Sequence, residues 1–255
     1  MSSFVELPIE KIDKWLWTYF RAMFILSRTY NQEDELQVTS IKCFVQNVIN
    51  LMPNQYIKMR FTEYVYMNSN VKNLLLSNPD LQQFFRVYSN IAEVMKYSSS
   101  QFEFLDYCSK SNFSMFIWVY LMQSYYIILL NKYGNYVKVP KFNEFRSSYD
   151  PDKLSKDDWG NSLWFIIHVS SIYGAGEMYD VFENYKAMLS CLQYILPCPK
   201  CKQHLIDNLA HIDIDDCAGS RQALFKCSWQ LHNIVNESLG KRQPSLQEAF
   251  GYYRF

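Results

Sequence analysis

Residues 196–204 read LPCPKCKQH, with two cysteines separated by two residues and a histidine three residues further on. This spacing suits three kinds of chemistry: a metal site, a thioredoxin-like redox motif, and a dithiol that transfers electrons to a bound cofactor. The nine residues alone do not choose between them.

The prolines around the cysteine pair predict that it opens a helix. Pro197 ends the preceding helical pattern, and Pro199 has the fixed φ that suits a first helical position. Cys198 is therefore the predicted N-cap, and both sulfurs lie in the first turn, where the helix dipole stabilises a thiolate. Lys200 and Lys202 add positive charge nearby. This is the environment of a reactive dithiol, although a zinc knuckle would use the same turn.

The zinc and thioredoxin interpretations each lack a part that they need. Structural zinc takes four ligands, and the chain has no second CxxC pair. The remaining candidate ligands are His204, His211, Cys217 and Cys227. A thioredoxin-like site needs a strand before the motif, whereas the preceding MYDVFENYKAMLSCLQYIL has a helical pattern. Both interpretations stay open as alternatives to a cofactor-linked dithiol.

Two predicted helices near the dithiol each carry an aromatic ring and a histidine on one face. In WGNSLWFIIH, Trp164 and His168 are four residues apart, which is about one helical turn. In CSWQLHNIVNESLGK, Trp229, His232 and Asn236 repeat this arrangement. Each histidine taken alone would more often be an ordinary core residue. Two such faces beside a dithiol instead indicate a flat slot walled by indole and imidazole rings.

Such a slot suits a flavin dinucleotide. Asn236 has an amide that can hydrogen-bond the edge of a heterocycle, and Lys241 follows just beyond the glycine that ends the helix, where it can meet a phosphate. The rings would cover the flat faces of the ligand.

The composition excludes several other classes of protein. The 255 residues are 49% hydrophobic and 17% aromatic, which is enough to fill a sizeable core. The 25 basic residues balance 25 acidic ones, so we expect no nucleic-acid partner. With only seven glycines and eight prolines, a turn-rich β-sandwich and glycine-rich phosphate loops are both disfavoured. The predicted class is all-α.

The chain divides into two predicted helical regions. Residues 1–140 have apolar residues at helical spacing but no motif with recognisable chemistry, and their role is unknown; a dimer or assembly surface is one option. Residues 131–160 mix prolines, a glycine and charges, which breaks the pattern and places a boundary near residue 140. Residues 141–255 form the second domain. Its predicted helices span 161–172, 179–194, 199–210 and 220–239, with a short piece from 245.

Several features bear on location. The N-terminus lacks a basic n-region, and the odd count of seven cysteines does not suit a secreted disulfide scaffold, so we expect cytosol or nucleus. Cys43 and Cys108 have no neighbouring cysteine, and we interpret both as small buried hydrophobes. Residues 111–131 carry no charge and are near membrane-spanning length. Because polar residues are spread through this segment, we predict a buried core or subunit-contact helix, not a membrane partner.

Three motifs together resemble one family. The elements are WGxxLWxxIH at residues 159–168, PCxxCxxH at residues 197–204, and HNxVNxxLGK at residues 232–241. In this order and over about residues 155–253, they resemble the Erv/ALR family of FAD-linked sulfhydryl oxidases. Residues 1–140 carry no such resemblance. The Tyr, Asn and Phe content and the unfamiliar N-terminal region suggest a member from a large DNA virus, acting in the infected cell or associated with the virion.

The resemblance implies a fold and a reaction. The fold would be a four-helix bundle with a short fifth helix that holds FAD, usually as a homodimer. The enzyme would form disulfides in protein thiols and pass the electrons through FAD to dioxygen, giving hydrogen peroxide. Cys201 would be the cysteine next to the flavin and Cys198 the partner that exchanges with substrate. The implied FAD-binding residues are Trp164, His168, Tyr173, His232, Asn233, Asn236 and Lys241, and no metal is implied.

The sequence departs from the family pattern at its other cysteines. Cys217 and Cys227 are closer together than the family's structural disulfide, and within one helix they would be ~15 Å apart, too far to bond. We therefore expect that disulfide to be absent or formed differently. No second CxxC exists to act as a shuttle. The rival hypothesis from another class is a non-catalytic helical assembly protein.

Overall fold

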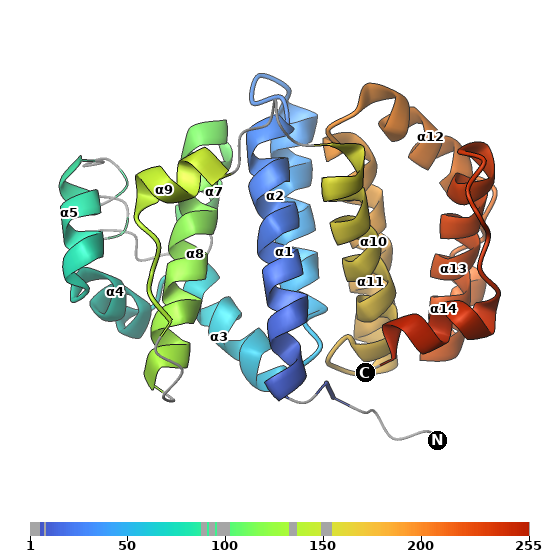
Figure 1. The fold of residues 1–255 in the computed structure, drawn as a ribbon, viewed down its shortest axis with the longest axis horizontal. Coiled ribbons are helices and arrows are strands. Elements are labelled where there is room, and N and C mark those ends of the chain that lie inside the picture. The colour runs from blue at the N-terminus through green and yellow to red at the C-terminus, as the bar shows by residue number, and fades with distance from the viewer. Residues whose placement is uncertain are drawn as a thin grey trace.

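The computed structural model describes residues 6–7, 9–87, 91, 95, 103–132, 137–148 and 155–254, and all regular structure within them is helical (Figure 1). The predicted all-α class is confirmed. The N-terminal region, as we call residues 6–148, contains α1 (Ile9–Thr29), α2 (Glu35–Asn50), α3 (Gln55–Val65), α4 (Ser69–Leu76), α5 (Pro79–Val87), α7 (Glu103–Ser109), α8 (Asn112–Lys132) and α9 (Phe142–Ser148). The C-terminal region, residues 155–254, contains α10 (Lys156–Tyr173), α11 (Met178–Ile195), α12 (Pro199–Leu209), the 3₁₀ turn η2 (Asp215–Cys217), α13 (Arg221–Ser238) and α14 (Leu246–Tyr253).

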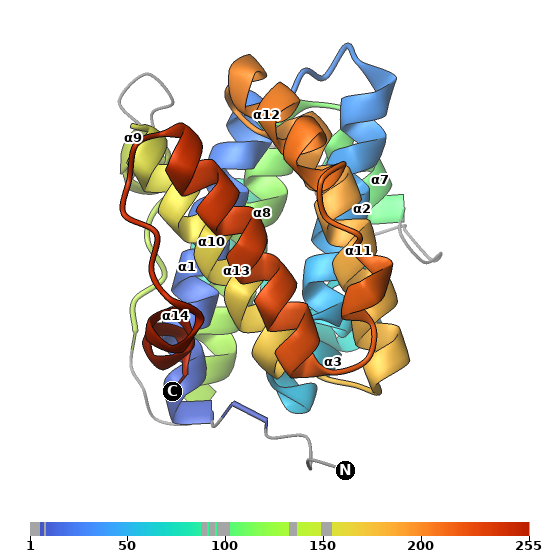
Figure 2. The same ribbon diagram turned by 90° about the vertical axis from the view of Figure 1, so that its right-hand side faces the viewer.

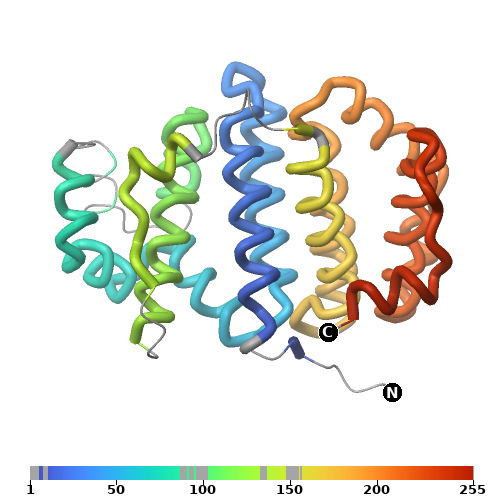
Figure 3. The backbone as a smooth tube through the Cα atoms, in the orientation of Figure 1, coloured from blue at the N-terminus to red at the C-terminus, as the bar shows by residue number. Residues whose placement is uncertain are grey.

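The helices stack side by side around a central pair. Figure 1 shows α1 and α2 in the middle, with α8 and the short helices α4, α5, α7 and α9 on one side. On the other side α10 and α11 pack against the central pair, α1 on α10 and α2 on α11, and α13 and α14 lie outermost. The tube in Figure 3 shows that α12 crosses between α11 and α13 at one end of the molecule. The C-terminal region is therefore a helical bundle resting on a helical wall.

The helices of the C-terminal region match those that the sequence predicts to within one residue at each end, except that α10 begins at Lys156, five residues earlier than predicted and inside the predicted break. Local signals explain their ends. Ser155 and Asp158 form a capping box at the start of α10, and Ser245 and Glu248 form another at α14. At the end of α13, Gly240 adopts a φ of 64°, a left-handed conformation that costs glycine little. The predicted glycine stop is confirmed.

Helix α8 is the uncharged segment of membrane-spanning length. By length and composition it could cross a bilayer, but 72% of its apolar window is buried inside the protein. Its residues from Met115 to Ile127 are all buried, so the helix has no exposed face over this stretch. Tyr64 donates a hydrogen bond of 2.9 Å to the carbonyl of Trp118 and so fixes α3 on α8. The predicted buried core helix is confirmed.

A disulfide joins the two regions and corrects one prediction. Cys43 of α2 bonds Cys191 of α11, with Cα atoms 6.2 Å apart. The interpretation of Cys43 as an unbonded buried hydrophobe is therefore wrong; its partner lies 148 residues away, a separation that spacing along the chain does not reveal. The interpretation of Cys108 as a buried thiol is confirmed.

The segment around the predicted domain boundary packs on the N-terminal region. Phe142 of α9 lies 5.2 Å from Tyr120, and Phe145 lies 4.1 Å from Phe24, measured between ring centroids. These contacts tie α9 to α1 and α8. The division at residue 140 stays a prediction.

Candidate active site

The cysteine pair begins α12 as the sequence predicts. Cys198 is the N-cap, with extended backbone angles, and its sulfur accepts a 3.3 Å hydrogen bond from the backbone N–H of Cys201. Pro199 occupies the first helical position. A backbone N–H at this position has no acceptor within the helix, so the missing N–H of proline costs no hydrogen bond. The two sulfurs therefore lie within the first turn, beside the positive end of the helix dipole.

The two cysteines have different surroundings. Both are half-buried, and Cys201 packs against the hydrophobic core of the bundle. Cys198 lies at the turn that follows Pro197, outside the regular helix. This arrangement gives one sulfur an inward face and leaves the other at the helix end.

Three of the predicted site residues form one ring cluster. The rings of Trp164 and His232 stack with centroids 4.0 Å apart and planes inclined by 7°. His168, one turn after Trp164 on α10, contacts His232 through a hydrogen bond of 2.9 Å between its Nε2 and the partner's Nδ1. The two faces that the sequence predicts on α10 and α13 thus meet in space.

The hydrogen bonds around His168 set the direction of every proton in the cluster. The Ser228 hydroxyl donates to the carbonyl of Phe225 at 2.7 Å, so it must accept from Nδ1 of His168, 2.9 Å away. Nε2 of neutral His168 is then an acceptor, and Nδ1 of His232 donates to it. In this tautomer the second nitrogen of His232, Nε2, carries a lone pair that can accept a hydrogen bond.

Both imidazoles are held neutral. Burial lowers the pKa of His168 well below its ordinary value, and the neighbouring His232 acts in the same direction. Burial, assisted by the charge of Lys241, lowers the pKa of His232 to about 4. At neutral pH the cluster therefore has flat uncharged rings that suit an aromatic ligand.

The remaining predicted residues lie toward the C-terminal end of α13. Asn233 donates to the carbonyl of Pro244 at 3.1 Å, as the Trp229 indole does at 2.8 Å, while the Asn233 Oδ1 is buried without a hydrogen bond. Asn236 is buried, and its carbonyl accepts from the backbone N–H of Lys241 at 2.8 Å. These contacts hold the segment that leads into α14 against α13.

Lys241 is exposed, and its ammonium lies 3.4 Å from the carboxylate of Asp157 near the start of α10. The ion pair joins the ends of the two ring-bearing helices. Tyr173 is buried. It is the last residue of α10 and lies more than one turn beyond His168.

Two residues of the cluster escaped the sequence reasoning. Ser228 lies four residues before His232 on the same face of α13, so helical spacing could have revealed it. Tyr253 of α14 lies 4.3 Å from the His168 ring, and no spacing signal connects it to α10. It closes the cluster from the opposite side.

The second disulfide of the structure joins the two cysteines that the sequence analysis expects not to bond within one helix. Cys217 and Cys227 are bonded, with Cα atoms 6.2 Å apart. The two residues do not share a helix, because Cys217 lies in η2 and the chain turns before α13 begins. The ~15 Å separation that one helix would impose therefore does not apply.

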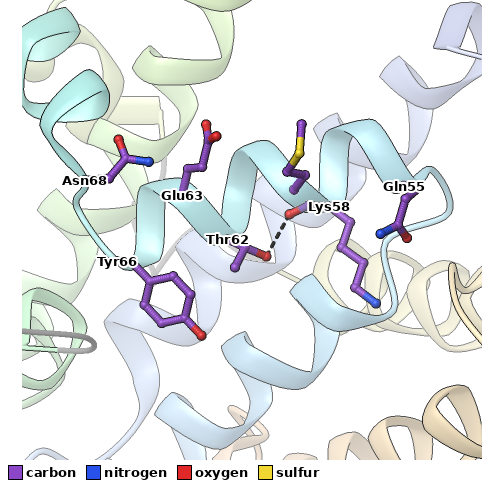
Figure 4. Close-up of a pocket in the computed structure, with 7 residues that line it drawn as sticks. Gln55, Lys58, Thr62, Glu63, Tyr66 and Asn68 are labelled. Carbon is purple, nitrogen blue, oxygen red and sulfur yellow. Dashed lines mark hydrogen bonds between the residues drawn. The ribbon is translucent and has the colours of Figure 1, made fainter.

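Other parts of the described chain lack comparable features. Among these residues, no three His, Cys, Asp or Glu side chains gather in a way that could hold a metal. A pocket of about 350 Å³ runs along α3 (Figure 4). Its lining residues are Gln55, Lys58, Met59, Thr62, Glu63, Tyr66 and Asn68. A second pocket, of about 560 Å³, lies between α3, α4 and α8. Neither pocket is lined by a residue of the predicted site.

Comparison with known proteins finds relatives of the C-terminal region. Residues 161–254 match the model of the Erv1 / Alr family. A protein of Invertebrate iridescent virus 3, named as an FAD-linked sulfhydryl oxidase, is 30% identical over 97 residues, covering 38% of this chain and 66% of its own length. A protein of Acanthamoeba polyphaga mimivirus with the same name is 29% identical over 98 residues, covering 38% and 68%. A third, from Frog virus 3, is 28% identical over 99 residues, covering 37% and 65%.

These matches define the class of the C-terminal region. A helical bundle with a CxxC pair at a helix start and a Trp and His ring cluster is the arrangement of a flavin-linked dithiol protein. Residues 161–254 of the chain belong to the Erv1 / Alr family. The chain spans about two thirds of the length of the curated relatives it matches. No solved structure matches the chain significantly.

Proposed function

We propose that the protein is an FAD-dependent sulfhydryl oxidase that forms disulfide bonds in protein thiols and uses dioxygen as electron acceptor. The observation that carries the proposal is the dithiol at the start of α12 in the same bundle as the Trp164, His168 and His232 cluster. A reactive dithiol and a neutral flat-walled cluster are the two parts that such an oxidase needs.

The residues present suit FAD. The rings of Trp164 and His232 offer flat faces, and the buried Oδ1 of Asn233 lacks a hydrogen bond that a donor on a bound heterocycle could supply. Lys241, with its exposed ammonium, would meet a phosphate. We assign Tyr173, His168 and Asn236 to the same site. When bound, FAD would supply two-electron chemistry between a thiolate and dioxygen.

The cysteines would divide the thiol chemistry between them. A substrate thiolate would attack the sulfur of Cys198 in the Cys198–Cys201 disulfide, forming a mixed disulfide and releasing Cys201 as a thiolate. The helix start favours this step, because the dipole stabilises the leaving thiolate and so improves it as a leaving group. The packing of Cys201 against the bundle core directs the released charge inward.

A visible spectrum and a thiol assay test this function together. The purified protein should be yellow and show a flavin absorbance, and unfolding should release the flavin from the chain. With dithiothreitol as substrate it should consume oxygen and produce hydrogen peroxide. A colourless protein with bound zinc, or a flavoprotein that does not react with thiols, would reject the proposal.

We further propose the partners and setting. The viral origin of the relatives supports a role in a virus-infected cell, where protein thiols would be the substrates. A homodimer is proposed because the large apolar side chains of Leu239, just after α13, and of Leu246 and Tyr252 on α14 are exposed. Light scattering of the purified protein would measure its mass, and a monomer at micromolar concentration would contradict this part.

A further inference from the structure

The N-terminal region reaches the dithiol helix. Figures 1 and 2 place α12 and the turn between α1 and α2 at the same end of the molecule. There the ammonium of Lys202, on α12, donates a 3.0 Å hydrogen bond to Oε1 of Gln37, on α2. Gln37 and Lys202 are 165 residues apart in sequence, so the contact exists only because the fold brings the regions together.

Hydrogen bonds to other residues hold the side-chain amide of Gln37 in place, independently of Lys202. Its Nε2 donates to Oδ2 of Asp34 at 2.9 Å, and its Oε1 also accepts from the backbone N–H of Asn31 at 3.0 Å. Asp34 is itself held as the N-cap of α2, where it accepts from the N–H of Leu36 at 3.0 Å. The amide orientation therefore follows from its partners, with the oxygen turned to Lys202.

Lys202 lies one turn along α12 from Cys198, the N-cap of that helix. It follows Cys198 by four residues, which is about one helical turn, and its backbone N–H donates to the Cys198 carbonyl at 3.0 Å. Lys200, by contrast, lies between the two cysteines and is exposed. The chain thus carries two lysines beside the dithiol, of which Lys202 is the one tied to α2.

We propose that Lys202 is a positioning residue for the thiolate that attacks Cys198, and that Gln37 of the N-terminal region, itself held by Asp34, keeps its ammonium in place. The inference rests on the proposed oxidase function. In the exchange step the incoming thiolate forms a new S–S bond to Cys198 while the Cys198–Cys201 bond breaks. The electron pair of the broken bond leaves with Cys201, so one anion enters and one is released. A cation held one helical turn from Cys198 attracts the incoming anion.

The test measures the electrostatic potential at Cys198 without using the flavin. In a Cys201→Ser background, the Cys198 thiol is alkylated either by anionic iodoacetate or by neutral iodoacetamide, and mass spectrometry of the Cys198 peptide follows each reaction. The rate with iodoacetate divided by the rate with iodoacetamide reports the local charge. Changes in exposure or in the thiolate population affect both reagents alike and cancel in this ratio. We expect Lys202→Gln to lower the ratio about threefold to tenfold. Lys202→Arg keeps the positive charge, so the ratio should stay close to that of the protein with Lys202.

A double-mutant cycle tests the part played by the N-terminal region. Gln37→Ala should lower the ratio about twofold on its own and have little effect in a Lys202→Gln background. Lys200→Gln is the matched control: it removes a charge beside the same cysteine, but its effect should add to that of Gln37→Ala. An unchanged ratio in Lys202→Gln would overturn the role of Lys202. A Gln37→Ala effect that is absent, or that persists without Lys202, would overturn the role of α2.

Steady-state kinetics then separate this inference from the proposed function. Lys202→Gln should lower kcat/KM for dithiothreitol and leave the rate at saturating thiol nearly unchanged. If the wild-type protein shows no thiol-dependent oxygen uptake, the oxidase function fails. If the wild-type protein is active and Lys202→Gln matches it in both assays, only the role of Lys202 fails.

Discussion

The two regions of the molecule bury different kinds of side chain. Among the described residues, the largest fully buried side chains come almost entirely from the N-terminal region; the C-terminal region contributes only Tyr185. The others are Trp15, Trp118, Tyr19, Tyr64, Tyr126, Phe20, Phe24, Phe44, Phe61, Phe104 and Phe116. Both regions bury serines and side-chain amides, but among the described residues only the C-terminal region buries a histidine, His168.

This difference suggests that the N-terminal region supports the fold and that the C-terminal region contains the residues that could react or bind a ligand. Aromatic rings in contact contribute burial and ring-pair energy, so the N-terminal region makes a stable wall for α10 and α11. All four histidines of the chain and the CxxC pair lie in the C-terminal region. Polar and heteroaromatic groups stabilise a core less than close-packed apolar rings do, but they can hold a ligand and move charge. The first region therefore contributes most of the largest buried rings, and the second contributes the histidines and the dithiol.

The largest expected difference in activity is between replacing a cysteine of the C-terminal region and replacing one of the N-terminal region. Cys201→Ala removes the thiolate that is proposed to leave the disulfide, so thiol-dependent oxygen uptake should fall to background. Cys108→Ala removes a buried thiol of the N-terminal region and should leave the turnover of the folded protein unchanged. An oxygen electrode with dithiothreitol as substrate measures both. Equal losses in the two variants would break the division between support and chemistry.

The disulfide between the regions should stabilise the protein more than the one within the C-terminal region. The chain-entropy estimate grows with the loop that is closed: about 5 kcal/mol for Cys43–Cys191, with a sequence separation of 148, against about 3 kcal/mol for Cys217–Cys227, with a separation of 10. Paired Cys→Ser variants avoid leaving a lone thiol. Chemical denaturation of each pair variant gives the free energies of unfolding, and a larger loss from the Cys217 and Cys227 variant would contradict the estimate.

The sequence predicted the helices of the C-terminal region and the neighbours within each helix because that information lies within single helices. The helix bounds, the cap at Cys198 and the shared faces of Trp164 with His168 follow from spacing and capping rules. Ser228 obeys the same rule, since it lies one turn before His232. The family motifs supplied the cysteine roles, which remain a proposal.

Contacts between distant segments were beyond such rules. The bond of Cys43 to Cys191, the approach of Tyr253 to His168 and the link of Gln37 to Lys202 each depend on how helices are arranged. Periodicity tells which face of a helix is buried but not against which helix. The assumption of one helix for Cys217 and Cys227 failed although Gly219 and Ser220 mark a turn between them, and the helix predicted over 220–239 already leaves Cys217 outside.

Removing one large ring from the N-terminal core should reduce stability and not chemistry. Trp118 is fully buried in α8, and Trp118→Ala should lower the free energy of unfolding by about 3 to 5 kcal/mol through the cavity it leaves. Phe113, on the same helix but 40% exposed, is the matched control, and its replacement by alanine should cost much less. Denaturation curves give the stabilities, and oxygen uptake per mole of flavin gives the activity. A Trp118→Ala protein that stays stable but loses activity would show that the N-terminal core takes part in the reaction.

The neutral histidines should make the stability of the C-terminal region sensitive to acid. Burial lowers the pKa of His232 from 6.5 to about 4, so between these pH values the unfolded chain binds a proton that the folded chain does not. The free energy of unfolding should therefore be fully retained above pH 6.5 and fall as the pH drops toward 4, by about 3 kcal/mol from this group. His232→Gln should flatten this slope, whereas His211→Gln, at an exposed position, should not. Melting temperatures between pH 7 and 4.5 measure the slope. Because the N-terminal region has no histidine, a slope that persists unchanged in His232→Gln would move the acid sensitivity to His168 or to carboxylates, and away from the stacked imidazole.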